Sequence, residues 1–225
     1  MKKSLFICGF IIFEMAGVTS AAIALDADWT VNTAIPDGSP VGIAASETFQ
    51  NLMSGPITSV DVDLNISGGY NGDLYAYLAG PNGGVAVLLN RTGVTAGNSF
   101  GYADSGFNVT FDDSAANGIH LYQPISNPNG GILTGTWQPD GENLDPQSAP
   151  SAFTGAQTAL LGSLNGNDPN GTWTLFLADL SAGGQANLIS WQLDITAIPE
   201  PAATTLAALG GLALLVLRHS KQRRL

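Results

Sequence analysis

The sequence predicts an all-β protein, an antiparallel sandwich of two sheets, and two observations lead to this fold class. Through most of residues 25–198, apolar side chains recur at every second position in short runs, the pattern of strands with one buried and one solvated face. Clusters of Gly, Pro and Asn separate these runs, and no amphipathic helical pattern interrupts them. The 28 Gly and 12 Pro among 225 residues make the chain rich in turns without making it low in complexity.

Each expected strand follows from its own residues. In the first clear run, Val60 and Val62 face one side of the sheet while Asp61 faces the other. Alternating strands are expected at residues 60–66, 74–78, 107–111, 173–177 and 189–195, a continuous apolar strand at 85–89, and weaker strands at 29–35 and 48–53. Trp173 and Trp191 take inward positions and should pack near the centre of the core.

The body between the two chain ends is long enough for one domain and is strongly acidic. Its 174 residues, 25–198, suffice for one well-cored domain, with the poorly patterned residues 122–159 forming excursions and one short strand. A single cation, Arg91, stands against 16 Asp and Glu, a formal charge near −15. This charge excludes nucleic acid as a partner, disfavours anionic lipid and favours divalent cations. The alternative, which stays open, is that the acidity only keeps an exported protein soluble.

The last 27 residues, 199–225, combine a Pro-Glu-Pro triplet (Pro199, Glu200 and Pro201), an uncharged apolar run over 202–217 and a basic end over 218–225. Proline cannot continue a helix, so a transmembrane helix of roughly 24 Å is expected to begin after the triplet. The basic end is expected to stay cytoplasmic. This arrangement resembles the PEP-CTERM sorting tail, which implies transient membrane anchoring, passage through the export machinery and removal by an exosortase. A permanent C-terminal anchor is the alternative.

Residues 1–24 have the pattern of a signal peptide. A positive start is followed by an apolar stretch over residues 5–13 and by the small-x-small sequence that ends at Ala24. We expect cleavage after Ala24, with Ala22 as the alternative. Cys8, the single cysteine, falls in this segment, so the exported body has no thiol for a disulfide, a thiolate metal site or a nucleophile.

Three motifs of the body give a second resemblance. They are NGDLYAYLAGPNG at residues 71–83, FDDSA at 111–115, and NGTWTL at 170–175 followed by Asp179 and by ISWQL at 189–193. In this order they resemble the proprotein-convertase P domain (P/Homo B), over about residues 55–195. The resemblance implies a jelly-roll β-sandwich, which is similar to galactose-binding folds. One departure is that residues 67–70 stand where the family often has a histidine.

The same motifs place four carboxylates at strand edges, and they are candidates for a metal site. The residues are Asp73, Asp112, Asp113 and Asp179. Oxygen ligands gathered from neighbouring strand ends are what Ca²⁺ requires, so we expect one structural Ca²⁺ held by some of these side chains and by backbone oxygens. The alternative is that Asp73 and Asp179 cap turns through backbone N–H groups.

No catalytic residue is predicted. The single histidine of the body, His120, lies in a loop-like stretch without a Gly-x-Ser-x-Gly elbow, and we expect it on the surface. Glu47 and Glu142 are the only glutamates of the body, which leaves few candidates for paired-carboxylate chemistry.

These features predict an exported, non-catalytic module at the cell surface or in the extracellular matrix. It would act by adhesion or binding to a polysaccharide or protein, with Tyr75 and Tyr77 on the outer face as contact residues. One alternative is an accessory P domain that assists a subtilisin-like serine protease in trans. A second alternative is a secreted hydrolase.

Overall fold

A computed structural model of the whole chain describes residues 23–52, 55–198, 210–212, 215 and 219, with side chains from residue 27 onward. The chain divides into two compact units, Ala22–Glu200 and the two chain ends taken together, Met1–Ala21 and Pro201–Leu225. In the second unit the described residues are helical. Within the described residues we find no helix with the length and apolar character needed to cross a membrane. The predicted sorting triplet, most of the predicted span over 202–217 and nearly all of the predicted signal peptide lie outside them.

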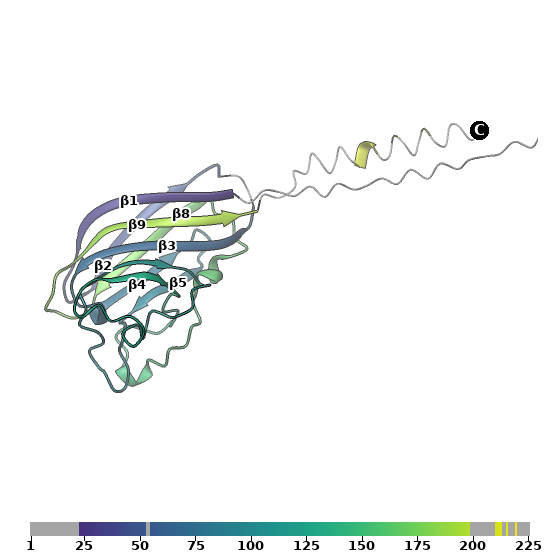
Figure 1. Cartoon of the computed structure of the whole chain (residues 1–225). Helices are drawn as coiled ribbons and strands as arrows, with labels where there is room; N and C mark the ends of the chain where they lie inside the picture. Colours follow the sequence, from purple (N-terminus) through teal and green to yellow (C-terminus); the bar gives the residue numbers. More distant parts are fainter. Residues whose placement is uncertain (1–22, 53–54, 199–209, 213–214, 216–218, 220–225) are drawn as a thin grey trace, which may run out of the picture. The chain divides into compact units, whose positions relative to one another are not determined.

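The regular structure of the unit Ala22–Glu200 is almost entirely strand, with long irregular connections between some of the strands (Figure 1). In its described part the strands are β1 (Ile23–Ile35), β2 (Ser39–Phe49), β3 (Ile57–Gly68), β4 (Leu74–Ala79), β5 (Val85–Asn90), β6 (Gly106–Phe111), β7 (Leu133–Trp137), β8 (Gly171–Asp179) and β9 (Ala186–Ala197). The same described part contains the short 3₁₀ turns η1 (Asn71–Asp73), η2 (Pro150–Ala152) and η3 (Leu161–Leu164). The predicted cleavage position, Ala24, lies inside β1, and the cleavage itself stays a prediction.

The strands form two layers. One sheet has the order β1-β9-β3-β6-β7 and the other has the order β2-β8-β4-β5, which confirms the predicted β-sandwich. The prediction of a wholly antiparallel arrangement is wrong at one place, because β7 pairs with β6 in parallel. Between the two strands the chain has 21 residues, 112–132, and such a long connection lets it return to the end of the sheet where β6 began.

The alternation located most strands correctly, and its two failures have local causes. The second strand runs over Ser39–Phe49 rather than 48–53, because a register shift between Ser39 and Ile43 interrupts its period of two. In β9 the pairing passes from Asn65 with Ser190 to Ile66 with Leu188. Ile189 therefore occupies a bulge and is only half-buried, while Leu188 faces the core.

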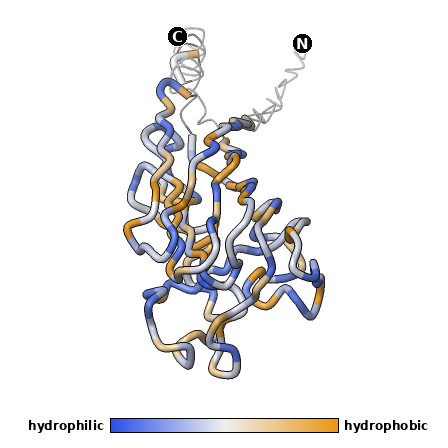
Figure 2. Tube along the Cα trace, turned by 90° about the vertical axis from the view of Figure 1, so that its left-hand side faces the viewer, coloured by the Kyte–Doolittle hydropathy of each residue, from blue (hydrophilic) through white to orange (hydrophobic). Residues whose placement is uncertain are grey.

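The core lies between the two sheets and contains the two predicted tryptophans. Trp173 and Trp191 are 0% and 1% exposed, which confirms their inward positions. The indole N–H of Trp173 donates to the carbonyl of Pro169 at 2.9 Å, and the ring of Trp191 lies 4.5 Å from that of Trp29. Hydrophobic and hydrophilic residues alternate along the strands as orange and blue sections of the trace (Figure 2). The side chains on the inner face of each sheet thus fill the interior.

The outer face of the five-stranded sheet is polar and crowded with carboxylates. Pairing places Asp61 beside Asp194 across β3 and β9. Burial raises the pKa of Asp61 to about 6, and the charges of four neighbouring carboxylates add to the rise. They belong to Asp112, Asp194, Asp113 and Asp63. This face opposes ionisation of Asp61 in the folded state.

We expect Asp61→Asn to raise the free energy of unfolding at pH 7 by about 1 kcal/mol, a value reduced for the solvent that still reaches this side chain. An unfolded Asp61 has the ordinary pKa of 3.8, so between about pH 4 and pH 6 the folded state holds more protons and stability falls as pH rises. Urea unfolding between pH 3.5 and 7.5 measures both effects. Asp61→Asn should reduce the decrease of the free energy of unfolding with rising pH. Asp28→Asn, which replaces an exposed carboxylate of β1, should leave that decrease unchanged. An unchanged slope in Asp61→Asn would contradict the assignment.

Candidate functional site

Irregular segments beside the edge strand β5 bring three ionisable side chains together. Asp140 N–H donates to the carbonyl of Leu88 at 3.1 Å, and Gly141 N–H donates to that of Val87 at 2.9 Å, so this segment pairs with β5. Gly141 has a positive φ of 69°, and a Cβ there would lie 2.8 Å from a methyl carbon of Leu160. The positive φ and the close contact require glycine at this tight turn, and Asp140 and Glu142 flank it in the chain.

His120 is buried, so its expected surface position is wrong. The residue is 8% exposed. Its Nδ1 lies 2.7 Å from Oδ2 of Asp140, and its Nε2 lies 2.9 Å from the carbonyl oxygen of Val94. The expectation failed because a residue outside any periodic run carries no local signal of burial, and here distant loops cover it.

The geometry fixes where the protons of His120 lie. A carbonyl only accepts hydrogen bonds, so Nε2 carries a proton and donates it to Val94. At 2.7 Å, Nδ1 and the Asp140 carboxyl must share one further proton. Burial alone would lower the pKa of His120, but the hydrogen bond and charge of Asp140 outweigh it and raise the pKa above its ordinary value. Neither nitrogen is free to serve as the base of a Ser-His-Asp triad in this arrangement.

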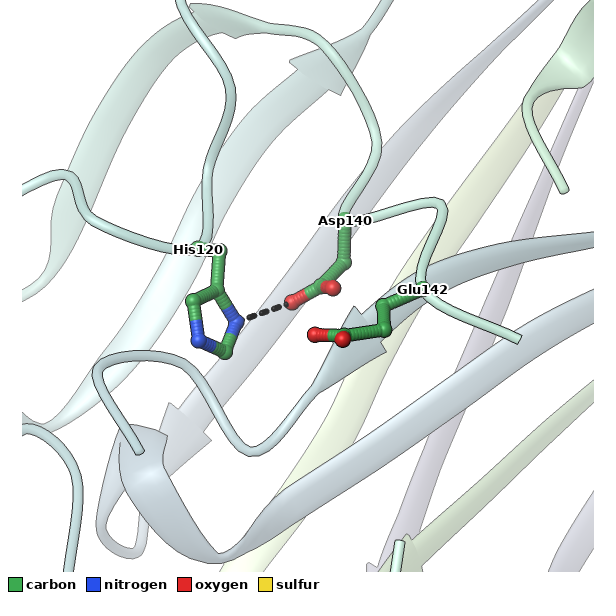
Figure 3. A group of neighbouring side chains, drawn as sticks. All are labelled: His120, Asp140 and Glu142. Atoms are coloured by element: carbon green, nitrogen blue, oxygen red, sulfur yellow. Dashed lines mark hydrogen bonds and ion pairs between the residues drawn. The ribbon is translucent and has the colours of Figure 1, made fainter. Parts of the chain in front are cut away.

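Glu142 completes the cluster. It is 4% exposed, and its carboxylate accepts the backbone N–H of Thr154 at 2.7 Å and that of Gly155 at 3.2 Å. One donor atom from each of His120, Asp140 and Glu142 lies within 4.8 Å of the others (Figure 3). Within the described residues this is the group of at least three His, Cys, Asp or Glu side chains whose spacing could hold a metal ion.

One oxygen of this cluster has no protein partner. Asp140 Oδ2 accepts from His120 and, at 3.2 Å, from the backbone N–H of Asn90. Asp140 Oδ1 is buried and accepts no hydrogen bond from the protein. Such an atom inside a folded domain calls for an explanation, because a buried acceptor without a partner is costly.

A pocket of about 270 Å³ opens beside the cluster. Its lining includes His120 and Asp140 together with Phe153, whose ring stacks on the imidazole at 6.1 Å and 10°. The remaining lining residues are Thr95, Gly118, Leu121, Thr154, Gly155 and Gln157. The pocket gives a small polar molecule or water access to the edge of the cluster.

Two of the four predicted calcium ligands come together. Asp179, the last residue of β8, pairs with Leu74, the residue after Asp73, and Leu180 N–H donates to the Asp73 carbonyl at 2.9 Å. Burial raises the pKa of Asp179 to about 6, and the nearby charges of Asp73 and Asp37 add to the rise. Asp179 Oδ2 is buried without a protein partner. These carboxylates are thus close enough to repel each other.

The other two predicted ligands follow β6 in the opposite sheet. Asp112 accepts the backbone N–H of Ser114 at 2.7 Å, which closes a turn. Asp113 accepts the N–H groups of Leu161 and Gly162 at 3.0 and 2.6 Å and so fixes η3 against the end of β6. Their oxygens accept backbone N–H groups, a role that was expected, as the alternative, of Asp73 and Asp179.

The predicted contact tyrosines belong to an aromatic cluster on the outer face of the four-stranded sheet. Tyr75 and Tyr77 are half-buried side chains of β4, and Phe176 of β8 joins them. Tyr77 stacks on Phe176 at 4.9 Å and 19°, and Tyr75 packs on Tyr77 at 5.9 Å. We call these three side chains the aromatic platform.

Fold and site together define an all-β sandwich whose loops hold a buried His-Asp-Glu cluster. No family of known proteins matches the chain, and neither does any curated protein. Two solved structures that resemble it contain a serine protease of Aeromonas sobria, the first in complex with the chaperone ORF2. The first has a TM-score of 0.46 and 16% identity over 80% of this chain and 28% of that chain. The second has a TM-score of 0.44 and 15% identity over 79% and 27%. The chain thus spans under a third of either structure, and likeness at this level carries no functional conclusion.

We expect Asp140→Ala to lower the free energy of unfolding by about 3 kcal/mol, because it removes the partner of a buried imidazole and the acceptor of the Asn90 N–H. Asp145→Ala removes a carboxylate from an exposed turn nearby and should cost under about 1 kcal/mol. Urea unfolding at pH 7 compares the two variants. Equal stabilities would show that the buried pair contributes nothing to the fold.

Proposed function

We propose that the protein is an exported, non-catalytic binding module that acts at the cell surface or in the extracellular matrix, with a polysaccharide as its ligand. The observation that supports this proposal is the aromatic platform of Tyr75, Tyr77 and Phe176 on the outer face of the four-stranded sheet. Large aromatic side chains that stay partly exposed on a rigid strand lose little entropy on binding, and tyrosine is enriched in contact surfaces.

A ladder of hydroxyl groups lies on the same face as the platform. Thr172 and Thr174 alternate with inward residues along β8 and point to the same side as Phe176. The Thr174 hydroxyl lies 2.8 Å from that of Ser46, and the Thr172 hydroxyl lies 2.8 Å from that of Thr48. Ring faces beside hydroxyl groups complement a sugar chain, which also presents apolar ring faces and hydroxyls.

Export rests on the sequence features of the two chain ends, namely a signal peptide over residues 1–24 and a tail that resembles the PEP-CTERM signal over 199–225. In this proposal an exosortase reads Pro199, Glu200 and Pro201 and removes the tail after transient membrane anchoring. The sandwich is assigned to the jelly-roll type of the P domain. The strand order supports this, because β1, β3, β6 and β9 share one sheet while β2, β4, β5 and β8 share the other.

The alternatives differ in what the protein would contact. An accessory domain for a subtilisin-like protease would bind that protease rather than a glycan, and it stays a prediction from the P-domain resemblance. A hydrolase that used His120 as its base would need a free ring nitrogen, and both nitrogens are engaged. The aromatic platform therefore favours the binding module.

We expect immobilised polysaccharide from the producing cells to retain the purified protein, and Tyr77→Ala to weaken retention at least about tenfold, as for loss of a central aromatic contact. Tyr70→Ala is the matched control, since Tyr70 is 45% exposed and precedes β4 rather than lying on this face. Thermal unfolding of each variant shows that the fold is intact. Unaltered retention of Tyr77→Ala, or retention by a protease instead of the glycan, would contradict the proposal.

We also propose that Asp73 and Asp179 hold a structural Ca²⁺, a narrower form of the expected four-carboxylate site. The repulsion between them and the unpartnered Oδ2 of Asp179 support it, because a cation would relieve both. Millimolar Ca²⁺ should raise the Tm by about 4 °C or more. Asp179→Asn should abolish this rise, and Asp112→Asn should retain it. Equal Tm values with Ca²⁺ and with a chelator would refute the site.

A further inference from the structure

We propose that His120, Asp140 and Glu142 form a binding site for a divalent transition-metal ion of the Zn²⁺ class. This site is separate from the aromatic platform and from the calcium ligands proposed above, and it does not depend on either. One donor atom of each side chain lies within 4.8 Å of the other two, close to the spacing of ligands around one metal ion. Figure 3 shows both carboxylates pointing toward the space beside the imidazole.

The imidazole is oriented as a metal ligand requires. Metal-bound histidine typically donates its second ring N–H to a carbonyl or carboxylate, which fixes the tautomer. Here Nε2 donates to the Val94 carbonyl at 2.9 Å, so Nδ1 is the nitrogen turned toward Asp140. The metal would take the place of the proton that Nδ1 and Asp140 share.

The carboxylates are also held in place by the surrounding backbone. The N–H groups of Thr154 and Gly155 fix Glu142, and the Asn90 N–H fixes Asp140. Glu142 Oε1 accepts two hydrogen bonds from Thr154, but its Oε2 accepts the Gly155 N–H and Asp140 Oδ1 accepts none, so each carboxylate keeps an oxygen with a lone pair for an ion. The site thus needs little rearrangement to bind an ion.

The charges of the cluster and its unfilled hydrogen-bond acceptor both favour a bound cation. Two carboxylates and one imidazole are buried together, and Arg91 is the only Lys or Arg between residues 25 and 198. Among the described residues, the ion pair joins His120 to Asp140, and Glu142 has no cationic partner. The charge of a divalent ion equals that of the two carboxylates, and Asp140 Oδ1, buried without a partner, supplies a ligand oxygen.

The donor set selects the metal, and the pocket supplies an open position. Calcium and magnesium prefer oxygen alone, whereas imidazole suits zinc and its neighbours. Three protein ligands leave at least one coordination position for water or a ligand. The pocket of about 270 Å³ lined by His120 and Asp140 is where that position would open.

Nitrogen NMR of the full-length protein labelled with ¹⁵N-histidine tests the site directly. The chain has only two histidines, His120 and His219, so the second serves as an internal reference. One equivalent of Zn²⁺ should move the Nδ1 resonance of His120 to the range of a metal-bound nitrogen. His219 should not follow, and isothermal titration should give one tight site.

Variants separate this site from binding to the acidic surface. Glu142→Gln should weaken the affinity for Zn²⁺ at least about tenfold, while the glutamine oxygen still accepts the Thr154 N–H. Asp145→Asn, at an exposed turn, should leave the affinity unchanged. Zn²⁺ that binds without moving the His120 resonance, or with equal affinity in Glu142→Gln, would overturn the proposal. So would an unchanged spectrum at excess Zn²⁺, which needs no variant and is independent of any folding defect.

Discussion

The fold depends on buried side chains that accept hydrogen bonds from backbone N–H groups outside the strands. The two sheets pair their own peptide groups, but the long connections around β5 and β7 have no ladder and still lie partly inside the fold. Asp104 shows the solution, since its 2%-exposed carboxylate accepts the Tyr122 hydroxyl at 2.8 Å and the Gly130 N–H at 2.7 Å. Asn71 does the same between η1 and β6, where it bonds both the N–H and the carbonyl of Gly106. Without these acceptors the loops would bury unpaired N–H groups.

This constraint gives the acidity of the body a structural meaning. Carboxylates such as Asp104, Asp113 and Glu142 are held by N–H and O–H donors rather than by lysine or arginine. Because Arg91 is the only Lys or Arg of this body, its buried carboxylates depend on such donors, on His120 in the case of Asp140, or on metal ions. Asp140 and Asp179 each keep one buried oxygen without a donor, and these are the two places where we propose a cation.

The two outer faces of the sandwich have opposite character. On the five-stranded sheet, Asp61 lies among four other carboxylates, a surface that repels anions and resists its own ionisation. On the four-stranded sheet, the aromatic platform stands beside a hydroxyl ladder. We therefore place the proposed polysaccharide ligand on the second face, because the carboxylates of the first repel anionic polymers.

The sequence by itself determined the fold class, most strands and the inward positions of Trp173 and Trp191. These follow from a period of two, which is a local property that any single strand displays. Tertiary structure alone decided the parallel pairing of β7 with β6, the bulge at Ile189 and the burial of His120. Likewise, Asp73 and Asp179 meet through strand pairing, while Asp112 and Asp113 serve turns of the other sheet. Contacts between segments far apart in the chain leave no periodic trace, so only the folded arrangement could bring His120, Asp140 and Glu142 together.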